Sequence, residues 1–161
     1  LGFLIKNKIY LDNDISLKKR LISKSIEHFC RPKVYPNFLK NLLKTRSNKK
    51  MKRIGCTDSS DGLFQALQDL ARASKCKAII NYEKIPKDKD WPSGDKWDEY
   101  YFFGGEDYEL VFSLPKKWAK KLSNLDKNIN EIGFFTEGEP SIEFNESENN
   151  KLLNNAPFKH F

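Results

Sequence analysis

The sequence predicts an α+β fold for this chain of 161 residues. Two kinds of apolar spacing support the prediction. In several segments apolar residues recur every three or four positions, as on one face of a helix. Elsewhere short runs rich in Ile, Val and Phe end at Gly or Pro, which is typical of strands. A hydrophobic content of 39% is enough for one buried core and excludes a disordered chain.

The first part of the chain is predicted to form two helices. Apolar spacing over 17–29 indicates a helix that Asp14 or Ser16 caps and that ends before Pro32. Pro36 opens a shorter helix, since proline suits the first helical position. The stretch "RSNKKMK" at 46–52 is expected to be a polar loop.

Strands and helices alternate in the rest of the chain. A strand at 53–57, a helix over 62–74 and a strand after Lys77 have the order of a crossover unit. Residues 84–98, rich in Pro, Gly, Lys and Asp, are expected to be an exposed loop. A strand at 108–113 and a helix near Trp118 follow. Two strands joined by a Gly-Pro turn are predicted within 129–146.

Charge is distributed unevenly within a net charge of +7. Residues 1–53 hold 15 Lys and Arg against 3 Asp and Glu, whereas residues 54–161 hold 14 against 19. A basic segment of this kind can bind nucleic acid. Because its lysines alternate with apolar helix positions and have few aromatic neighbours, a solvated helix face is the preferred interpretation.

The sequence also argues against several classes of protein. Its longest apolar runs are far shorter than the roughly 20 residues that span a bilayer. The opening "LGFLIKNKIYL" has neither an initiator Met nor the features of a signal peptide, so we expect the chain to be cut from a longer protein. Three cysteines without metal-ligand spacing support neither a disulfide framework nor a zinc site, and a reducing cytoplasm is expected.

The motif "TDSSDG" at 57–62 places Asp58 and Asp61 close together at a predicted strand-to-helix turn. Two neighbouring carboxylates repel each other unless they are solvated, protonated or bridged by a cation, and Mg²⁺ prefers such oxygen ligands. The hydroxyl of Ser60 and the free N–H groups of a helix start suit phosphate. The same residues also suit a helix cap, so both interpretations stay open.

The motif "GGEDYEL" at 104–110 carries Glu106 and Asp107 on a flexible backbone just before a strand. A tight turn with solvated acids also fits this pattern. Because both acidic turns adjoin predicted strands, we expect that they can meet at one edge of a sheet. The closing "PFKHF" contains Phe158, which either caps the core or stacks on a flat heteroaromatic ligand.

Taken in order, "TDSSDGL", "GGEDYELVFSLP", "EIGFFTEG" and the final "FKHF" resemble the C-terminal half of the thiamine-monophosphate kinases. The segment "RASKCKAIINYEKIP" resembles the family's sequence between the first two motifs. The similarity spans residues 17–161, which are expected to be the C-terminal domain, while residues 1–16 are expected to be a linker or the remnant of an N-terminal domain. In the family an apolar residue usually stands at the position of Ser59, so this serine is expected to loosen the turn.

The resemblance implies a fold, a reaction and a set of site residues. The family is similar to aminoimidazole ribonucleotide synthetase, whose C-terminal domain has a mixed sheet covered by helices. The implied reaction transfers the γ-phosphoryl group of ATP to thiamine monophosphate, giving thiamine diphosphate and ADP. The implied roles are Mg²⁺ binding by Asp58 and Asp61, ATP contact by Ser60, and contact with thiamine monophosphate by Glu106 and Phe158.

The resemblance also implies partners for this chain. The family's N-terminal domain supplies most of the acids that bind ATP and Mg²⁺ and forms the homodimer, so the chain is expected to be inactive alone. Neither a nucleic acid nor a membrane is expected as a partner. Two alternatives stay open, namely another ATP-dependent synthetase of the same superfamily and a basic module whose first 53 residues bind nucleic acid.

Overall fold

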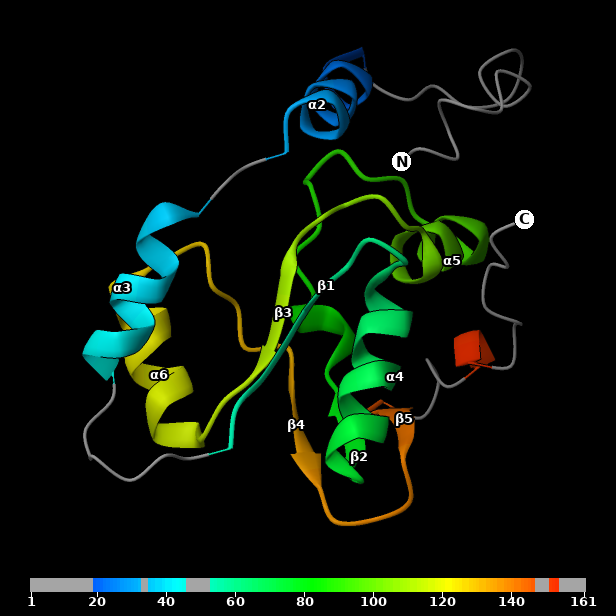
Figure 1. Ribbon diagram of the computed structural model, residues 1–161. Coiled ribbons are helices and arrows are strands. Elements are labelled where there is room, and N and C mark those ends of the chain that lie inside the picture. The colour runs from blue at the N-terminus through cyan, green and yellow to red at the C-terminus, as the bar shows by residue number, and fades with distance from the viewer. Residues whose placement is uncertain (1–18, 33–34, 46–52, 147–150, 154–161) are drawn as a thin grey trace.

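Short strands in the described part of the chain form two sheets, which the computed structural model shows in Figure 1. The model describes residues 19–32, 35–45, 53–146 and 151–153. Strand β1 (Gly55–Asp58) pairs antiparallel with β3 (Leu110–Ser113). In the second sheet β2 (Lys77–Ile80) lies between β4 (Gly133–Thr136), which is antiparallel to it, and β5 (Ser141–Phe144), which is parallel. The predicted α+β fold with a mixed sheet is confirmed.

One predicted strand arrangement is wrong. β1 and β2 do not pair as a crossover unit, because they belong to different sheets although helix α4 (Leu63–Ser74) connects them. The two strands predicted within 129–146 are present as β4 and β5, joined by residues 137–140, but each pairs with β2 and not with the other. Apolar spacing reports which residues are buried, whereas contacts between distant segments select the partner of each strand. The sequence pattern therefore predicted the strands but not their pairing.

The helices expected from apolar spacing are present. They are α2 (Lys19–Cys30), α3 (Pro36–Thr45), α4 and α6 (Lys116–Leu125). Figure 1 shows α3 and α6, which pack together, on one side of the β1–β3 pair and α4 on the other. The predicted caps Asp14 and Ser16 and the loop at 46–52 lie outside the described residues. Within the described ranges, every helix is too short or too polar to cross a bilayer.

The prediction of an exposed loop over 84–98 is wrong at both ends. The loop follows a short 3-10 helix (Tyr82–Lys84) and packs Ile85 into the core, and α5 (Asp95–Phe103) begins inside the predicted range. The last turn of helix α5 is the aromatic run at 100–103, in which Phe102 and Phe103 are buried and Tyr100 and Tyr101 are half-buried, so this turn has no charged face. Without a charged face in this turn, its spacing resembles neither a surface helix nor a strand, so the sequence pattern missed it.

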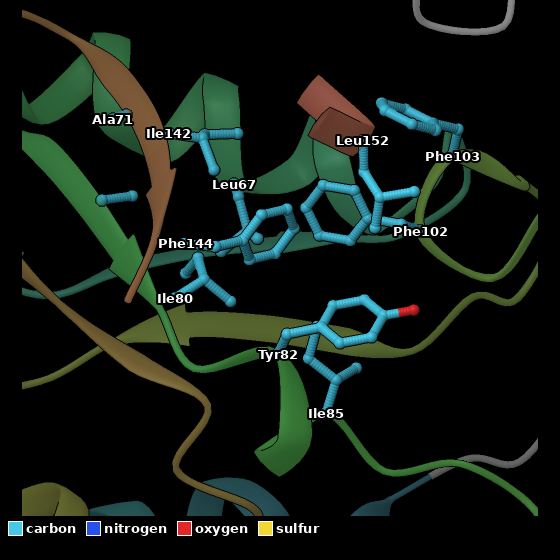
Figure 2. Packing of buried hydrophobic residues seen from close by; sticks show 11 residues of the cluster. Leu67, Ala71, Ile80, Tyr82, Ile85, Phe102, Phe103, Ile142, Phe144 and Leu152 are labelled. Carbon is cyan, nitrogen blue, oxygen red and sulfur yellow. The ribbon is translucent and has the colours of Figure 1, made fainter. Parts of the chain in front are cut away.

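The core lies between α4, the second sheet and α5, as Figure 2 shows. Helix α4 contributes Leu67 and Ala71, and α5 contributes Phe102, which is fully buried. The Phe102 ring centroid lies 4.9 Å from that of Phe144 on β5. Because α5 ends at the glycine pair of the second acidic motif, this packing also positions that motif.

Ion pairs attach α2 to the loop before α5. Lys24 Nζ lies 2.6 Å from Asp88 Oδ2, and Arg20 Nη2 lies 2.6 Å from Asp88 Oδ1. Arg20 Nε also donates to Asp90 Oδ2 at 2.7 Å. Arg20 and Lys24, two cations of the basic first third, are thus paired with acidic residues of this chain. The prediction that this segment presents a solvated helix face is therefore correct only in part.

Replacing Asp88 by Asn is expected to weaken the attachment of α2. Hydrogen bonds from Lys24, then from Asp90 N and Arg20, lower the pKa of the Asp88 carboxyl. Its stabilising contribution is therefore present above the ordinary Asp pKa of about 3.9 and is lost as the pH falls towards the lowered value. Salt should weaken it too, because Arg20 and Lys24 are largely exposed.

Amide hydrogen exchange of α2 measures this effect. In the parent chain we expect protection of α2 to fall with acidification below about pH 4 and in ~1 M salt. In Asp88→Asn, where the Arg20–Asp90 contact remains, protection at neutral pH and low salt should be lower than in the parent. Asp69→Asn is the control, since Asp69 faces Arg72 within α4 and is exposed. Equal protection of α2 in the parent and in Asp88→Asn would contradict the prediction.

Candidate functional site

The two acidic turns lie side by side at one edge of the β1–β3 pair. Because Asp58 pairs with Leu110, the end of β1 and the start of β3 coincide. Beyond the strands, Ser59 N donates to Glu109 O at 2.9 Å and Glu106 N donates to Ser60 O at 2.7 Å. The expectation that these turns meet at a sheet edge is confirmed.

Two glycines permit the turns to approach this closely. A Cβ atom on Gly105 would lie 2.6 Å from Ser60 O, closer than side chains tolerate. A Cβ on Gly62 would lie 2.7 Å from Phe103 O, and Gly62 also has φ +96, which L residues rarely adopt. The glycines of "SDG" and "GGE" are therefore required by the contact between the motifs.

Ser59 joins the turns and does not loosen them. Its side chain is 4% exposed, and its Oγ accepts a hydrogen bond of 3.0 Å from Glu109 N. The expectation drawn from the missing apolar residue is therefore wrong: the small hydroxyl satisfies a backbone donor of the neighbouring turn. The helix-cap interpretation also fails to explain the motif, because the N-cap of α4 is Gly62 and has no side-chain cap.

The predicted site residues occupy the outer part of this junction. Asp58 and Asp61 are exposed, and Ser60 Oγ donates to Asp58 Oδ1 at 3.1 Å. Glu106 is half-buried with φ +68, a strained conformation for a residue with a side chain. The structure thus brings Asp58, Ser60, Asp61 and Glu106 onto adjoining turns. Phe158 lies outside the described residues.

The donor set fits Mg²⁺ only together with a phosphorylated ligand. Within the described ranges, no group of three or more His, Cys, Asp or Glu side chains is arranged to hold a metal ion. Mg²⁺ commonly takes one or two carboxylates from the protein and completes its shell with phosphate oxygens and water. Asp58 and Asp61, both exposed and near the start of α4, suit this mode.

Sequence reasoning missed a group of residues behind the second turn. His28 Nε2 lies 2.9 Å from Asp107 O, and because a carbonyl only accepts, Nε2 is the donor. Tyr35 donates its hydroxyl to Glu109 Oε2 at 3.0 Å, and burial, followed by this hydrogen bond, raises the pKa of Tyr35 to about 12. Burial also raises the pKa of Asp107. His28 and Tyr35 stand in the N-terminal helical region, so spacing alone did not connect them with the motif.

Comparisons with known proteins give sequence relatives and structural neighbours of this chain. No protein-family model matches the chain. A thiamine-monophosphate kinase from Prochlorococcus marinus is 37% identical over 123 residues, which cover 76% of this chain and 37% of that protein. The structure of the Aquifex aeolicus thiamine monophosphate kinase has a TM-score of 0.60 at 23% identity and covers 88% of this chain and 44% of its own. AaThiL complexed with AMPPCP and TMP has a TM-score of 0.58 at 24% identity and covers 87% and 42%.

The structural matches define the class of protein first: this chain has the α+β fold of the ThiL structures. The sequence match then names the relatives. The chain is a relative of the thiamine-monophosphate kinases, and the part of them that it resembles is the C-terminal domain. It spans less than half the length of the proteins that it matches.

Proposed function

We propose that this chain is the C-terminal domain of a thiamine-monophosphate kinase. The whole protein would transfer the γ-phosphoryl group of ATP to thiamine monophosphate, giving thiamine diphosphate and ADP. The observation that carries the proposal is the hydrogen-bonded junction of the two acidic turns, which groups Asp58, Ser60, Asp61 and Glu106. The ligands in the AaThiL complex support an ATP-like nucleotide and thiamine monophosphate as the substrates.

The proposed roles follow from the charges at the junction. Carboxylates repel polyphosphate, so Asp58 and Asp61 would act through Mg²⁺, which neutralises charge on a transferred phosphoryl group. Ser60 would contact ATP, and its hydrogen bond to Asp58 orients that carboxylate. Glu106 would contact thiamine monophosphate and complement its cationic ring. Phe158 would pack on the rings of this substrate.

The remaining parts of the proposal concern the longer protein. Residues 17–161 would form the C-terminal domain and residues 1–16 the end of the preceding domain or a linker. An N-terminal domain would complete the ATP and Mg²⁺ sites and form the homodimer. The 161-residue chain alone is then expected to bind ligand without turnover. The proposed location is the cytoplasm.

Calorimetry on this chain tests the proposed site. We expect weak binding of thiamine monophosphate that requires Mg²⁺ and that falls about tenfold, or about 1.4 kcal/mol, in Asp58→Asn and in Glu106→Gln. Each variant removes one charge with little change of shape, so the fold should persist. Asp69→Asn removes an exposed carboxylate of α4 away from the turns and should leave the affinity unchanged. Equal heats for the parent, Asp58→Asn and Glu106→Gln would refute the site assignment.

A further inference from the structure

One face of helix α2 contacts the segments on both sides of α5. Arg20, Lys24 and His28 are spaced four residues apart, so their side chains lie on the same face of this helix. Arg20 and Lys24 are paired with Asp88 in the loop before α5. In the turn after α5, Asp107 O accepts a hydrogen bond of 2.9 Å from His28 Nε2. Helix α2 is therefore attached to the second acidic turn through His28.

The backbone of the second acidic turn is strained where this contact is made. Glu106 has φ +68 and Tyr108 has φ +53, although both residues carry side chains. Conformations of this kind persist in residues other than glycine only where the surrounding structure fixes them. Asp107, whose carbonyl oxygen accepts the hydrogen bond from His28, stands between the two. The contact from α2 is thus made at the centre of the strained segment.

The hydrogen bonds that fix this turn come from two separate segments of the chain. From the first acidic turn, Ser60 O accepts from Glu106 N at 2.7 Å. From the N-terminal helical region, Tyr35, which directly precedes α3, donates its hydroxyl to Glu109 Oε2 at 3.0 Å. His28 Nε2 also lies 3.5 Å from Glu109 Oε1. The N-terminal helical region therefore contacts both residue 107 and residue 109 of the second turn.

We propose that His28 and Tyr35 are positioning residues for Glu106. They hold the second acidic turn in the strained conformation that places Glu106 beside the first acidic turn. Both act through groups of the turn, the Asp107 carbonyl and the Glu109 carboxylate, and neither needs to contact a ligand. The consequence for ligand binding rests on the proposed function, whereas the effect on the turn does not.

Three variants of the 161-residue chain test the proposal by amide hydrogen exchange. His28→Phe removes the donor and keeps a ring, His28→Gln keeps an N–H donor, and Tyr35→Phe removes only the hydroxyl. Because each lost hydrogen bond is modest, we expect the Glu106 amide to exchange about three- to tenfold faster in His28→Phe and in Tyr35→Phe. Exchange in His28→Gln should match that of the parent. Amides of the central strand β2 should keep their protection, which separates an effect on the turn from a global loss of stability.

Tyr82→Phe is the control for removal of a hydroxyl. The Tyr82 hydroxyl accepts from Lys87 Nζ at 2.8 Å and belongs to a residue outside both turns, so exchange at Glu106 should not change. Unchanged exchange at Glu106 in His28→Phe would overturn the proposal, as would equally fast exchange in His28→Phe and His28→Gln. Should His28→Phe not fold, Tyr35→Phe decides, and unchanged exchange at Glu106 in that variant would overturn the proposal.

Calorimetry with thiamine monophosphate and Mg²⁺ tests the consequence for binding. We expect the affinity to fall about three- to tenfold in His28→Phe and in Tyr35→Phe and to be retained in His28→Gln. If the parent chain does not bind thiamine monophosphate, the proposed function fails, and amide exchange still decides whether His28 and Tyr35 fix the turn. If the parent binds it and His28→Phe and Tyr35→Phe bind equally well, the proposed function stands and the positioning role is overturned.

Discussion

Replacing Gly62 by alanine is expected to separate the two acidic turns and to destabilise the fold by about 2–6 kcal/mol. Two costs add. Gly62 has φ +96 and ψ 158, a region that alanine enters at a cost of about 1–3 kcal/mol. The new Cβ would also lie 2.7 Å from Phe103 O and 3.0 Å from Gly104 O, so the backbone of the second turn must move. The affinity of Gly62→Ala for thiamine monophosphate should also fall, because the displaced turn carries Glu106.

Gly94→Ala is the matched control for this experiment. Gly94 is likewise the N-cap of a helix, with φ 122 and ψ 153, but a Cβ there would meet no atom within 4 Å. Gly94→Ala should therefore lower the free energy of unfolding only by the conformational cost of alanine at this φ, about 1–3 kcal/mol, and leave ligand binding intact. Urea unfolding measures both variants. If Gly62→Ala were no more destabilising than Gly94→Ala, close contact between the turns would not be what requires Gly62.

Replacing Phe102 by alanine is expected to lower the free energy of unfolding by about 3–5 kcal/mol. The side chain is fully buried and its ring contacts those of Phe64, Phe103 and Phe144. Alanine would lose these contacts and leave a cavity that the surrounding core fills only in part. Because Phe102 lies two residues before Gly104, the second acidic turn should also become less ordered.

Urea unfolding and ligand titration measure the two effects of Phe102→Ala. Phe134→Ala is the control. It removes the same kind of side chain from the surface of β4, where Phe134 is 59% exposed. It should change the free energy of unfolding by less than about 1 kcal/mol. A similar loss in both variants would contradict the placement of Phe102 at the centre of the core.

Much of the candidate site was predictable because its residues are close in sequence. Asp58, Ser60 and Asp61 stand within one turn, and the motif around Glu106 is equally compact. Their positions beside strands also indicated that they could meet at a sheet edge. The requirement for Gly105 was not predictable, since it arises from Ser60 O, an atom of the other turn.

The features that the sequence pattern missed depend on contacts between residues far apart in the chain. Ser59 looked like a defect in its motif, yet its hydroxyl bonds to Glu109 N, which is 50 residues away. Helix α5 ends in aromatic residues because its last turn packs Phe102 and Phe103 into the core. His28 stands on α2, yet its ring contacts Asp107 O in the second turn, 79 residues later in the chain. Only the packing of α2 beside this turn brings the two residues together.

The sequence by itself determined the α+β class, the positions of helices α2, α3, α4 and α6 and the two acidic motifs, because spacing along one segment sets which face is buried. Only the tertiary structure decided which strands pair, which glycines the turns require and that the buried Ser59 hydroxyl joins the two turns. These features depend on distances between segments far apart in the chain, and such distances exist only after the core has packed.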